Sequence, residues 1–322
     1  MKIVVLDGHT LNPGDLSWTR FEAMGAVTVY ERSGYSAADR ALILQRAQGA
    51  DVLLINKTPL DRATLLALSP KLKYIGVLAT GYNIVDLDAA VRAGITVTNI
   101  PGYGTRAVAQ HALALLLELT NHCGLHDRAV KAGQWSSCPD FCFWDAPLTE
   151  LDGKTMGIVG LGRIGQQTAR LAAAFGMRVI ACHHVPQSTR VAELCSWDTL
   201  LSQSDVISLH CPLTAATYHL IDRQALSKMK RQALLINTSR GPLINEADLA
   251  TALHQGVIAG AGLDVMAEEP IAADNPLPNA PNCILTPHIA WASLESRQRL
   301  LNMAADNLAA FIAGQPQHVL TP

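Results

Sequence analysis

The pattern of apolar and polar positions in the first hundred residues alternates between short apolar runs and longer helical patterns. Helical periodicity is clearest from Ser36 to Gly49, where Ser36 is a typical N-cap residue and Gly49 ends the pattern. Strands separated by helices predict a parallel sheet with helices on both faces. The expected strands are the apolar runs KIVVLD, AVTVYE, DVLLIN, KYIGVLA and ITVTN.

A second alternation begins at Thr155, and a final helical pattern follows Thr286. Its apolar runs predict five or six further strands: TMGIVG, RVIAC, DVISLH, ALLINT, IAGAGLDV and CILT. The sequence therefore predicts an α/β protein with two doubly wound parallel-sheet domains of the Rossmann or flavodoxin type.

Two segments join these halves. A helical pattern from Thr105 to about Thr120 follows the Gly- and Pro-rich turn NIPGYG. The segment 133–155 is irregular and contains two Trp and two Phe residues. A segment this apolar is expected to pack, either against its own body or against a second subunit.

Composition and charge exclude several classes of protein. The chain has 322 residues, with 25 Lys and Arg against 27 Asp and Glu, so a basic face for nucleic acid is not expected. No apolar run reaches the roughly 20 residues of a membrane span, and Lys2 followed by IVVLD reads as a strand rather than a signal peptide. The seven cysteines form no CxxC pair, which argues against a disulfide framework or a metal site and favours the reducing cytoplasm.

A glycine-rich loop directly follows the first apolar run of the second half and opens a helical pattern. Its glycines are Gly160, Gly162 and Gly165, spaced as GxGxxG. Such glycines permit a tight turn, close backbone approach to a pyrophosphate and close packing of helix on strand. The helix N-terminus then offers N–H groups to the phosphates. The pattern predicts dinucleotide binding; the alternative is a tight turn that serves packing alone.

Three polar residues follow apolar runs of the second half: Arg240, Glu269 and His288. Ligands of open α/β sheets bind outside the carboxyl ends of the strands, so the three could meet beside a bound nicotinamide. Arginine can bind a carboxylate bidentately, and histidine can exchange a proton near neutral pH. Each residue also has a structural explanation, as a solvated strand-end arginine, a polar turn and a loop histidine. Their joint position after the phosphate loop favours catalysis.

The ordered motifs GLGRIG, HCPLT, NTSRGPLI, GLDV with EEP, and TPHIAWAS resemble the D-isomer-specific 2-hydroxyacid dehydrogenases. The resemblance covers nearly the whole chain, because TGYNIVDLDAA and AVAQHALALLL are also similar to segments of that family. Within the family, DFCFWDAPLTELDGKTMGIVG and HIAWAS are most similar to the glycerate dehydrogenases and hydroxypyruvate reductases.

The resemblance implies a role for each polar residue. Arg240 would bind the substrate's carboxylate and carbonyl oxygen, and His288 would give a proton to the carbonyl during reduction. Glu269 would hold and charge His288. The backbone at Thr80 and Gly81 would bind the carboxylate from the other domain. Apart from the resemblance, Lys57 in LLINKTPL is the cation expected on the substrate side besides Arg240; the alternative is that it is solvated.

The resemblance also implies the cofactor contacts. Asp264 would contact the nicotinamide carboxamide, with Thr238 and Ala290 nearby. The other residues expected to bind the nucleotide are Gly160, Gly162, Arg163, Ile164, Gly165, His183, His210, Cys211, Pro212 and Thr217.

The resemblance implies a discontinuous substrate-binding domain, residues 1–100 and 290–322, around a dinucleotide-binding domain, residues 101–289. It also implies a homodimer, to which the segment from Trp135 to Pro147 would contribute. The substrate is expected to be a small 2-keto or 2-hydroxy acid, hydroxypyruvate with D-glycerate or glyoxylate with glycolate. The alternatives are a broad-range D-2-hydroxyacid dehydrogenase acting on lactate or branched 2-keto acids, and a nucleotide-sensing binding protein like the corepressors that share this fold.

The expected cofactor is NAD(H) or NADP(H). An NAD site typically carries an Asp or Glu about 20 residues past the phosphate loop, which bonds the ribose hydroxyls. No acidic residue lies between Gly165 and Glu193, and His183 and His184 end the apolar run instead. Hydroxyl and cationic donors follow at Ser188, Thr189 and Arg190 and suit a 2′-phosphate, so we expect NADPH to be accepted at least as well as NADH. Alternatively, His183 bonds the ribose and the other donors are solvated.

Overall fold

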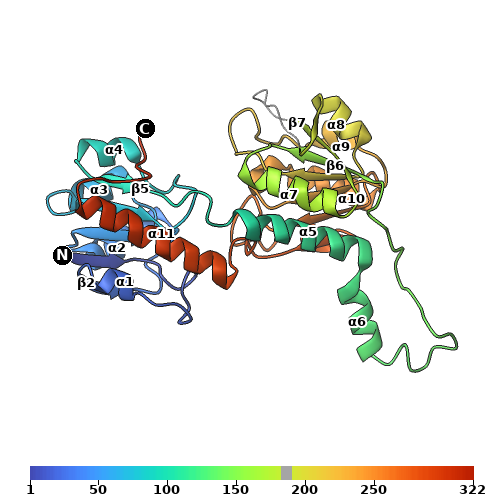
Figure 1. Cartoon of the computed structure of the whole chain (residues 1–322), viewed down its shortest axis with the longest axis horizontal. Helices are drawn as coiled ribbons and strands as arrows, with labels where there is room; N and C mark the ends of the chain where they lie inside the picture. The colour runs from blue at the N-terminus through green and yellow to red at the C-terminus, as the bar shows by residue number, and fades with distance from the viewer. Residues whose placement is uncertain (183–190) are drawn as a thin grey trace. The chain divides into compact units, whose positions relative to one another are not determined.

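A computed structural model of the chain describes residues 1–182 and 191–322 (Figure 1). The chain forms two compact units. The first unit contains Met1–Gly104 and Ala292–Pro322, and the second unit contains Thr105–Trp291. Each unit is built on a parallel sheet with helices packed on it, so the predicted fold class is confirmed.

The sheet of the first unit has five strands in the order β2-β1-β3-β4-β5, all parallel. Residues that alternate along its strands pack with α2, α3 and α4 on one face, while Tyr74 contacts Phe311 of α11 at a ring distance of 4.8 Å. The strands are β1 (Lys2–Val5), β2 (Ala26–Val29), β3 (Val52–Ile55), β4 (Tyr74–Val77) and β5 (Thr96–Thr98). The helices are α1 (Thr19–Glu22), α2 (Arg40–Ala47), α3 (Arg62–Leu68), α4 (Leu87–Arg92) and α11 (Leu294–Ile312).

The start of α2 differs from the prediction. A 3-10 turn, η1 (Ala37–Asp39), precedes the helix, which begins at Arg40 rather than directly after Ser36. The carboxylate of Asp39 accepts hydrogen bonds from the Ser36 hydroxyl at 2.9 Å and from the Ser36 N–H at 3.0 Å. Ser36 therefore precedes the 3-10 turn, and the N-cap residue of α2 is Asp39 rather than the predicted Ser36.

The second unit has a seven-stranded parallel sheet in the order β12-β11-β10-β9-β6-β7-β8. Five or six strands were expected; the additional one is β8, two residues at the sheet edge, too short to produce a periodic pattern. The strands are β6 (Thr155–Val159), β7 (Arg178–Cys182), β8 (Glu193–Leu194), β9 (Val206–Leu209), β10 (Leu234–Asn237), β11 (Gly260–Leu263) and β12 (Cys283–Leu285). The helices are α5 (Thr105–Asn121), α6 (Cys123–Lys131), α7 (Arg163–Ala174), α8 (Trp197–Gln203), α9 (Arg223–Lys228) and α10 (Glu246–His254), with 3-10 turns η2 (Gly241–Leu243) and η3 (Leu277–Asn279).

The order of connections reverses beside β6, because β7 lies on one side of it and β9 on the other. In open α/β sheets this switch point creates a crevice at the carboxyl ends of the strands, where ligands bind. The glycine-rich loop after β6 therefore lies where a dinucleotide is expected.

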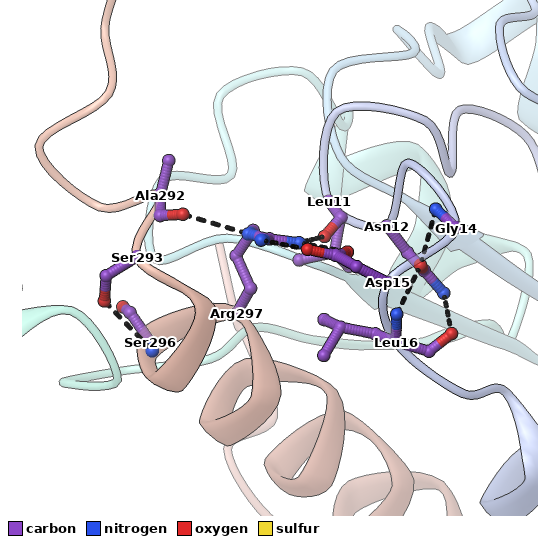
Figure 2. Close-up of polar contacts among 9 residues, drawn as sticks. All are labelled: Leu11, Asn12, Gly14, Asp15, Leu16, Ala292, Ser293, Ser296 and Arg297. Carbon is purple, nitrogen blue, oxygen red and sulfur yellow. Dashed lines mark hydrogen bonds and ion pairs between the residues drawn. The ribbon is translucent and has the colours of Figure 1, made fainter.

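The C-terminal segment of the first unit is held by a buried arginine on α11. Arg297 is 9% exposed and donates to Leu11 O and Ala292 O, each at 2.9 Å. It also donates two hydrogen bonds to the carboxylate of Asp15, at 2.8 and 2.6 Å (Figure 2). The Asn12 side chain folds the same loop by bonding to Leu16 (Figure 2). One guanidinium thus joins α11, near the end of the chain, to the loop of Leu11 and Asp15, near its beginning.

The irregular segment after α6 extends away from the sheet of the second unit (Figure 1). Trp135, Phe141 and Trp144 are 52%, 89% and 67% exposed. The segment therefore does not bury these rings against the rest of the second unit. Packing on the same chain was one of the two expectations for this segment.

Among the residues that the structure describes, no helix is both long enough and apolar enough to cross a membrane.

Candidate active site

The phosphate loop has the geometry that its glycines predict. Gly160 has φ +93°, and a Cβ there would lie 2.8 Å from the His210 carbonyl oxygen. A Cβ at Gly165 would lie 2.0 Å from Gly160 O, so glycine is needed where α7 packs on the loop. At Gly162, the N-cap of α7, a Cβ would meet nothing within 4 Å. Open space in front of a helix N-terminus fits a pyrophosphate, which the N–H groups of Arg163 and Ile164 would meet.

The loop after β9 lies against this phosphate loop. His210 donates its N–H to Val159 O at 2.7 Å, and its ring nitrogen Nε2 lies 2.9 Å from Ser208 Oγ. Burial lowers the pKa of His210 to about 4, so the ring is neutral at physiological pH. The next residue, Cys211, is buried. The Thr217 hydroxyl donates to Pro212 O at 2.7 Å and fixes the turn that follows.

A histidine–carboxylate pair forms after β11 and β12. His288 Nδ1 lies 2.7 Å from Glu269 Oε2, and the two side chains are 28% and 36% exposed. Because a carboxylate only accepts hydrogen bonds, Nδ1 carries the proton in this contact. Glu269 Oε1 also accepts the Met266 N–H at 3.2 Å.

The backbone of His288 has φ +54°, a left-handed conformation that is uncommon for residues other than glycine. Its N–H donates to Asp264 O at 2.8 Å. The Asp264 carboxylate accepts the N–H groups of Ile289 at 2.9 Å and Ala290 at 2.8 Å. The side chain of Asp264 is buried, and it supports the loop that presents His288.

Arg240 follows β10 and is exposed. Asn237 fixes its backbone, because the Asn237 amide donates to Arg240 O at 2.9 Å. A Cβ on the next residue, Gly241, would lie 1.9 Å from the carbonyl carbon of Met266. The Arg240 loop therefore packs directly on the loop that leads to Glu269.

Thr238 lies between β10 and Arg240 in the chain. Its Oγ1 is buried without a hydrogen-bond partner among the described residues. An unpartnered buried hydroxyl is costly unless a ligand or water satisfies it. Its position just before Arg240 fits the predicted location near the nicotinamide.

The second unit thus brings together the phosphate loop, the loop after β9, and the loops that carry Arg240, Glu269 and His288. Thr80, Gly81 and Lys57 belong to the first unit, and their part in the site stays a prediction. In that unit Asn99 Nδ2 donates to Thr80 O at 2.7 Å. His183 lies outside the described residues.

Two residues that sequence reasoning did not select also reach this site. His111 of α5 lies 3.0 Å from the hydroxyl of Thr286, which donates to Asp264 at 2.6 Å. The available signal for His111 was a polar residue beside Gln110 in the otherwise apolar pattern AVAQHALALLL. That pattern alone does not say which residue His111 would contact.

Comparison with known families agrees with this geometry. Residues 113–290 match the family described as "D-isomer specific 2-hydroxyacid dehydrogenase, NAD binding domain". The chain belongs to this family. The predicted family is confirmed, and so is the predicted activity, because the protein is an NAD(P)H-dependent oxidoreductase of 2-hydroxy acids.

Relatives of the chain cover it almost completely. A hydroxypyruvate reductase of Blautia hydrogenotrophica is 51% identical over 99% of this chain and 99% of its own length. A glycerate dehydrogenase of Methylorubrum extorquens is 45% identical over 86% of this chain and 88% of its own length. Among solved structures, an acyclic imino acid reductase in complex with NADPH and D-Arg is 31% identical, with a TM-score of 0.85 over 99% of this chain and 100% of that one.

Proposed function

We propose that this dehydrogenase reduces hydroxypyruvate to D-glycerate and glyoxylate to glycolate. The observation that carries the proposal is the Glu269–His288 pair on loops that adjoin Arg240 and belong to the same sheet edge as the phosphate loop. The names of two full-length relatives, a hydroxypyruvate reductase and a glycerate dehydrogenase, support the choice of substrate.

A reduced nicotinamide supplies the hydride when it is bound. Arg240 binds the carboxylate of the 2-keto acid and polarises its carbonyl oxygen. Nε2 of protonated His288 gives its proton to that oxygen as the hydride reaches carbon. Glu269 stabilises the imidazolium before the transfer and keeps Nδ1 protonated throughout, so the ring returns to a neutral tautomer that can be protonated again at Nε2.

We infer that the substrate is small and not phosphorylated. Lys57 is the cation that we expect on the substrate side besides Arg240, and it is exposed at the carboxyl end of β3. Its N–H donates to the Asp7 carboxylate, which also accepts the N–H groups of Asn56 and Thr58 at 2.7 and 2.8 Å. This turn is well fixed, but a phosphate group would require more positive charge than one lysine offers.

We infer that NADPH is accepted at least as well as NADH. Glu193, the first acid after the phosphate loop, pairs with Arg178 at 2.7 Å. Arg178 begins β7, whereas the ribose is expected at the carboxyl end of that strand. The carboxylate of Glu193 is therefore engaged away from the ribose position, and no acid precedes it after Gly165.

We also infer that the protein is a cytoplasmic homodimer. The exposed rings of Trp135, Phe141 and Trp144 favour a second subunit as the cover of this segment. The seven cysteines are free, as expected in a reducing compartment.

The proposed function is tested by steady-state kinetics with hydroxypyruvate, glyoxylate, pyruvate and phosphohydroxypyruvate, each with NADH and NADPH. We expect the highest kcat/KM for hydroxypyruvate or glyoxylate. His288→Ala should lower kcat by about 10²–10⁴-fold while NADPH still binds. A higher kcat/KM for phosphohydroxypyruvate, or near-normal turnover by His288→Ala, would contradict the proposal.

The cofactor assignment is tested separately with His183→Asp. The new carboxylate should bond the ribose and repel a 2′-phosphate, which shifts the ratio of kcat/KM values toward NADH. The expected shift is about tenfold for each 1.4 kcal/mol of discrimination. A parent enzyme that already prefers NADH strongly would show that the missing acid does not mark an NADPH site.

A further inference from the structure

A chain of three polar side chains connects helix α5 to the loop that carries His288. His111 Nε2 lies 3.0 Å from Thr286 Oγ1, and Thr286 Oγ1 lies 2.6 Å from Asp264 Oδ1. His111 Nε2 is also 3.5 Å from the same carboxylate oxygen. The three residues come from α5 and from the ends of β11 and β12, and His111 is 20% exposed.

The direction of these hydrogen bonds follows from the charge of Asp264. Burial alone would raise the pKa of this carboxyl group, but hydrogen bonds from His111, Thr286, Ala290 and Ile289 together hold it below the usual value. Asp264 is therefore ionised and only accepts. The hydroxyl of Thr286 has one proton, which it donates to Asp264, so it must accept from His111. Nε2 of His111 consequently carries a proton.

The last member of the chain supports the catalytic loop directly. The Asp264 carboxylate accepts from the N–H groups of Ile289 and Ala290, and the Asp264 carbonyl accepts the N–H of His288. His288 has φ +54°, a strained conformation for a residue with a Cβ. Such a conformation persists only where neighbouring contacts impose it, and here Asp264 supplies those contacts.

We propose that His111 is a positioning residue, which acts through Thr286 and Asp264 to hold the His288 loop in its reactive conformation. The inference rests on the proposed role of His288 as the proton donor. His111 keeps the carboxylate ionised and fixes the Thr286 hydroxyl, so the loop has one arrangement. The same hydrogen bonds fix the ionised carboxylate of Asp264, the residue expected to contact the nicotinamide carboxamide.

The test compares His111→Leu with His111→Gln and with a control, His254→Leu. Glutamine retains an N–H donor at the end of a side chain of similar length, whereas leucine retains only apolar bulk. His254 is also a helical histidine of the second unit, but it bonds to its own helix at Ala250 O. Each variant is assayed for kcat and KM with hydroxypyruvate, for the Kd of ADP-ribose, and for Tm.

We expect His111→Leu to lower kcat by about 10–100-fold, the effect of a misplaced catalytic group. Its Kd for ADP-ribose should not change, because the phosphate loop is untouched. His111→Gln should recover most of kcat, and His254→Leu should match the parent. If His111→Leu does not fold, Thr286→Val breaks the same chain with little change of shape and should give the same loss.

A second measurement separates positioning from general damage. Without the His111 hydrogen bond the pKa of Asp264 rises, so the acid limb of the kcat profile should move to higher pH in His111→Leu but not in His111→Gln. The other titratable groups of these loops, Glu268, Glu269, Asp274 and His288, are the same in both variants. Full kcat in His111→Leu, or equal losses in the Leu and Gln variants, would overturn the inference. Full activity in His288→Ala would instead overturn the proposed function.

Discussion

The imidazole Nδ1 of His288 lies 2.7 Å from Glu269 Oε2, so two residues that come from different loops form one hydrogen-bonded pair. Glu269→Gln keeps a hydrogen-bonding group of the same shape but removes the charge that stabilises an imidazolium. We expect kcat for hydroxypyruvate reduction to fall by about 10-fold or more, within the range for general acid–base groups. Steady-state kinetics check this, with Glu268→Gln as the control because Glu268 is the neighbouring exposed acid. Equal kinetics in the two variants would contradict a catalytic role for Glu269.

Arg240 should be sensitive even to replacement by lysine. Arg240→Lys keeps the positive charge but loses the planar fork that matches a carboxylate. A hydrogen bond to a charged group contributes about 1.5–3 kcal/mol, so kcat/KM should fall by roughly 10–150-fold. The matched control is Arg223→Lys, an exposed arginine paired with Asp248 at 3.6 Å. Parental kcat/KM in Arg240→Lys would show that the substrate is not held bidentately there.

The Arg297–Asp15 contact should contribute to the stability of the first unit. Arg297→Leu leaves the carbonyls of Leu11 and Ala292 without their donor. We therefore expect the free energy of unfolding to fall by an amount on the order of 2 kcal/mol. Arg20 and Asp306 form a control pair at 2.6 Å whose side chains are 51% and 62% exposed. Arg20→Leu should therefore cost less than about 1 kcal/mol. Urea unfolding of both variants checks the difference, and equal costs would contradict it.

His210 should make the protein less stable in mild acid. Burial lowers the pKa of His210 to about 4, while the unfolded chain protonates this residue near 6.5. Between these values the unfolded chain binds the extra proton, so stability is lost as the pH falls through this window. Because the residue keeps some exposed surface, we expect the free energy of unfolding to fall by about 1–2 kcal/mol between pH 7 and pH 5. His210→Gln should lose less stability over the same interval, and parallel losses in urea unfolding would contradict this.

The aromatic segment after α6 should determine the oligomeric state. Phe141 and Trp144 are 89% and 67% exposed, and a second subunit would bury them. We expect light scattering at micromolar concentration to show a dimer, and Phe141→Ser with Trp144→Ser to shift it toward monomer. Leu66→Ser, which changes a residue of the first unit that is 54% exposed, is the control. A monomeric parent would contradict this prediction.

The sequence by itself determined the features that depend on neighbouring residues. The alternation of apolar runs and helical patterns predicted two parallel sheets, because burial on both faces makes such strands uniformly apolar. The spacing of Gly160, Gly162 and Gly165 predicted the glycine-rich loop, since its tight turn and close packing leave no room for a Cβ at Gly160 and Gly165. Arg240 and His288 could be selected because each lies within two residues of the end of an apolar run.

Local pattern did not fix every element or element boundary. Ser36 is a typical N-cap residue, but its hydroxyl bonds to Asp39 and α2 begins at Arg40. The edge strand β8 has two residues and pairs only because β7 lies beside it.

Only the tertiary structure decided how the catalytic loop is held. His111 and Thr286 are 175 positions apart, and Thr286 and Asp264 are 22 apart, yet their side chains form one chain of hydrogen bonds. The periodicity of the sequence does not predict such contacts. A hydrogen bond between distant residues forms only where the packed sheet brings particular strand ends and helix faces together. The sheet order that places β11 between β10 and β12, with α5 packed on β10 and β11, is what brings His111 to Asp264.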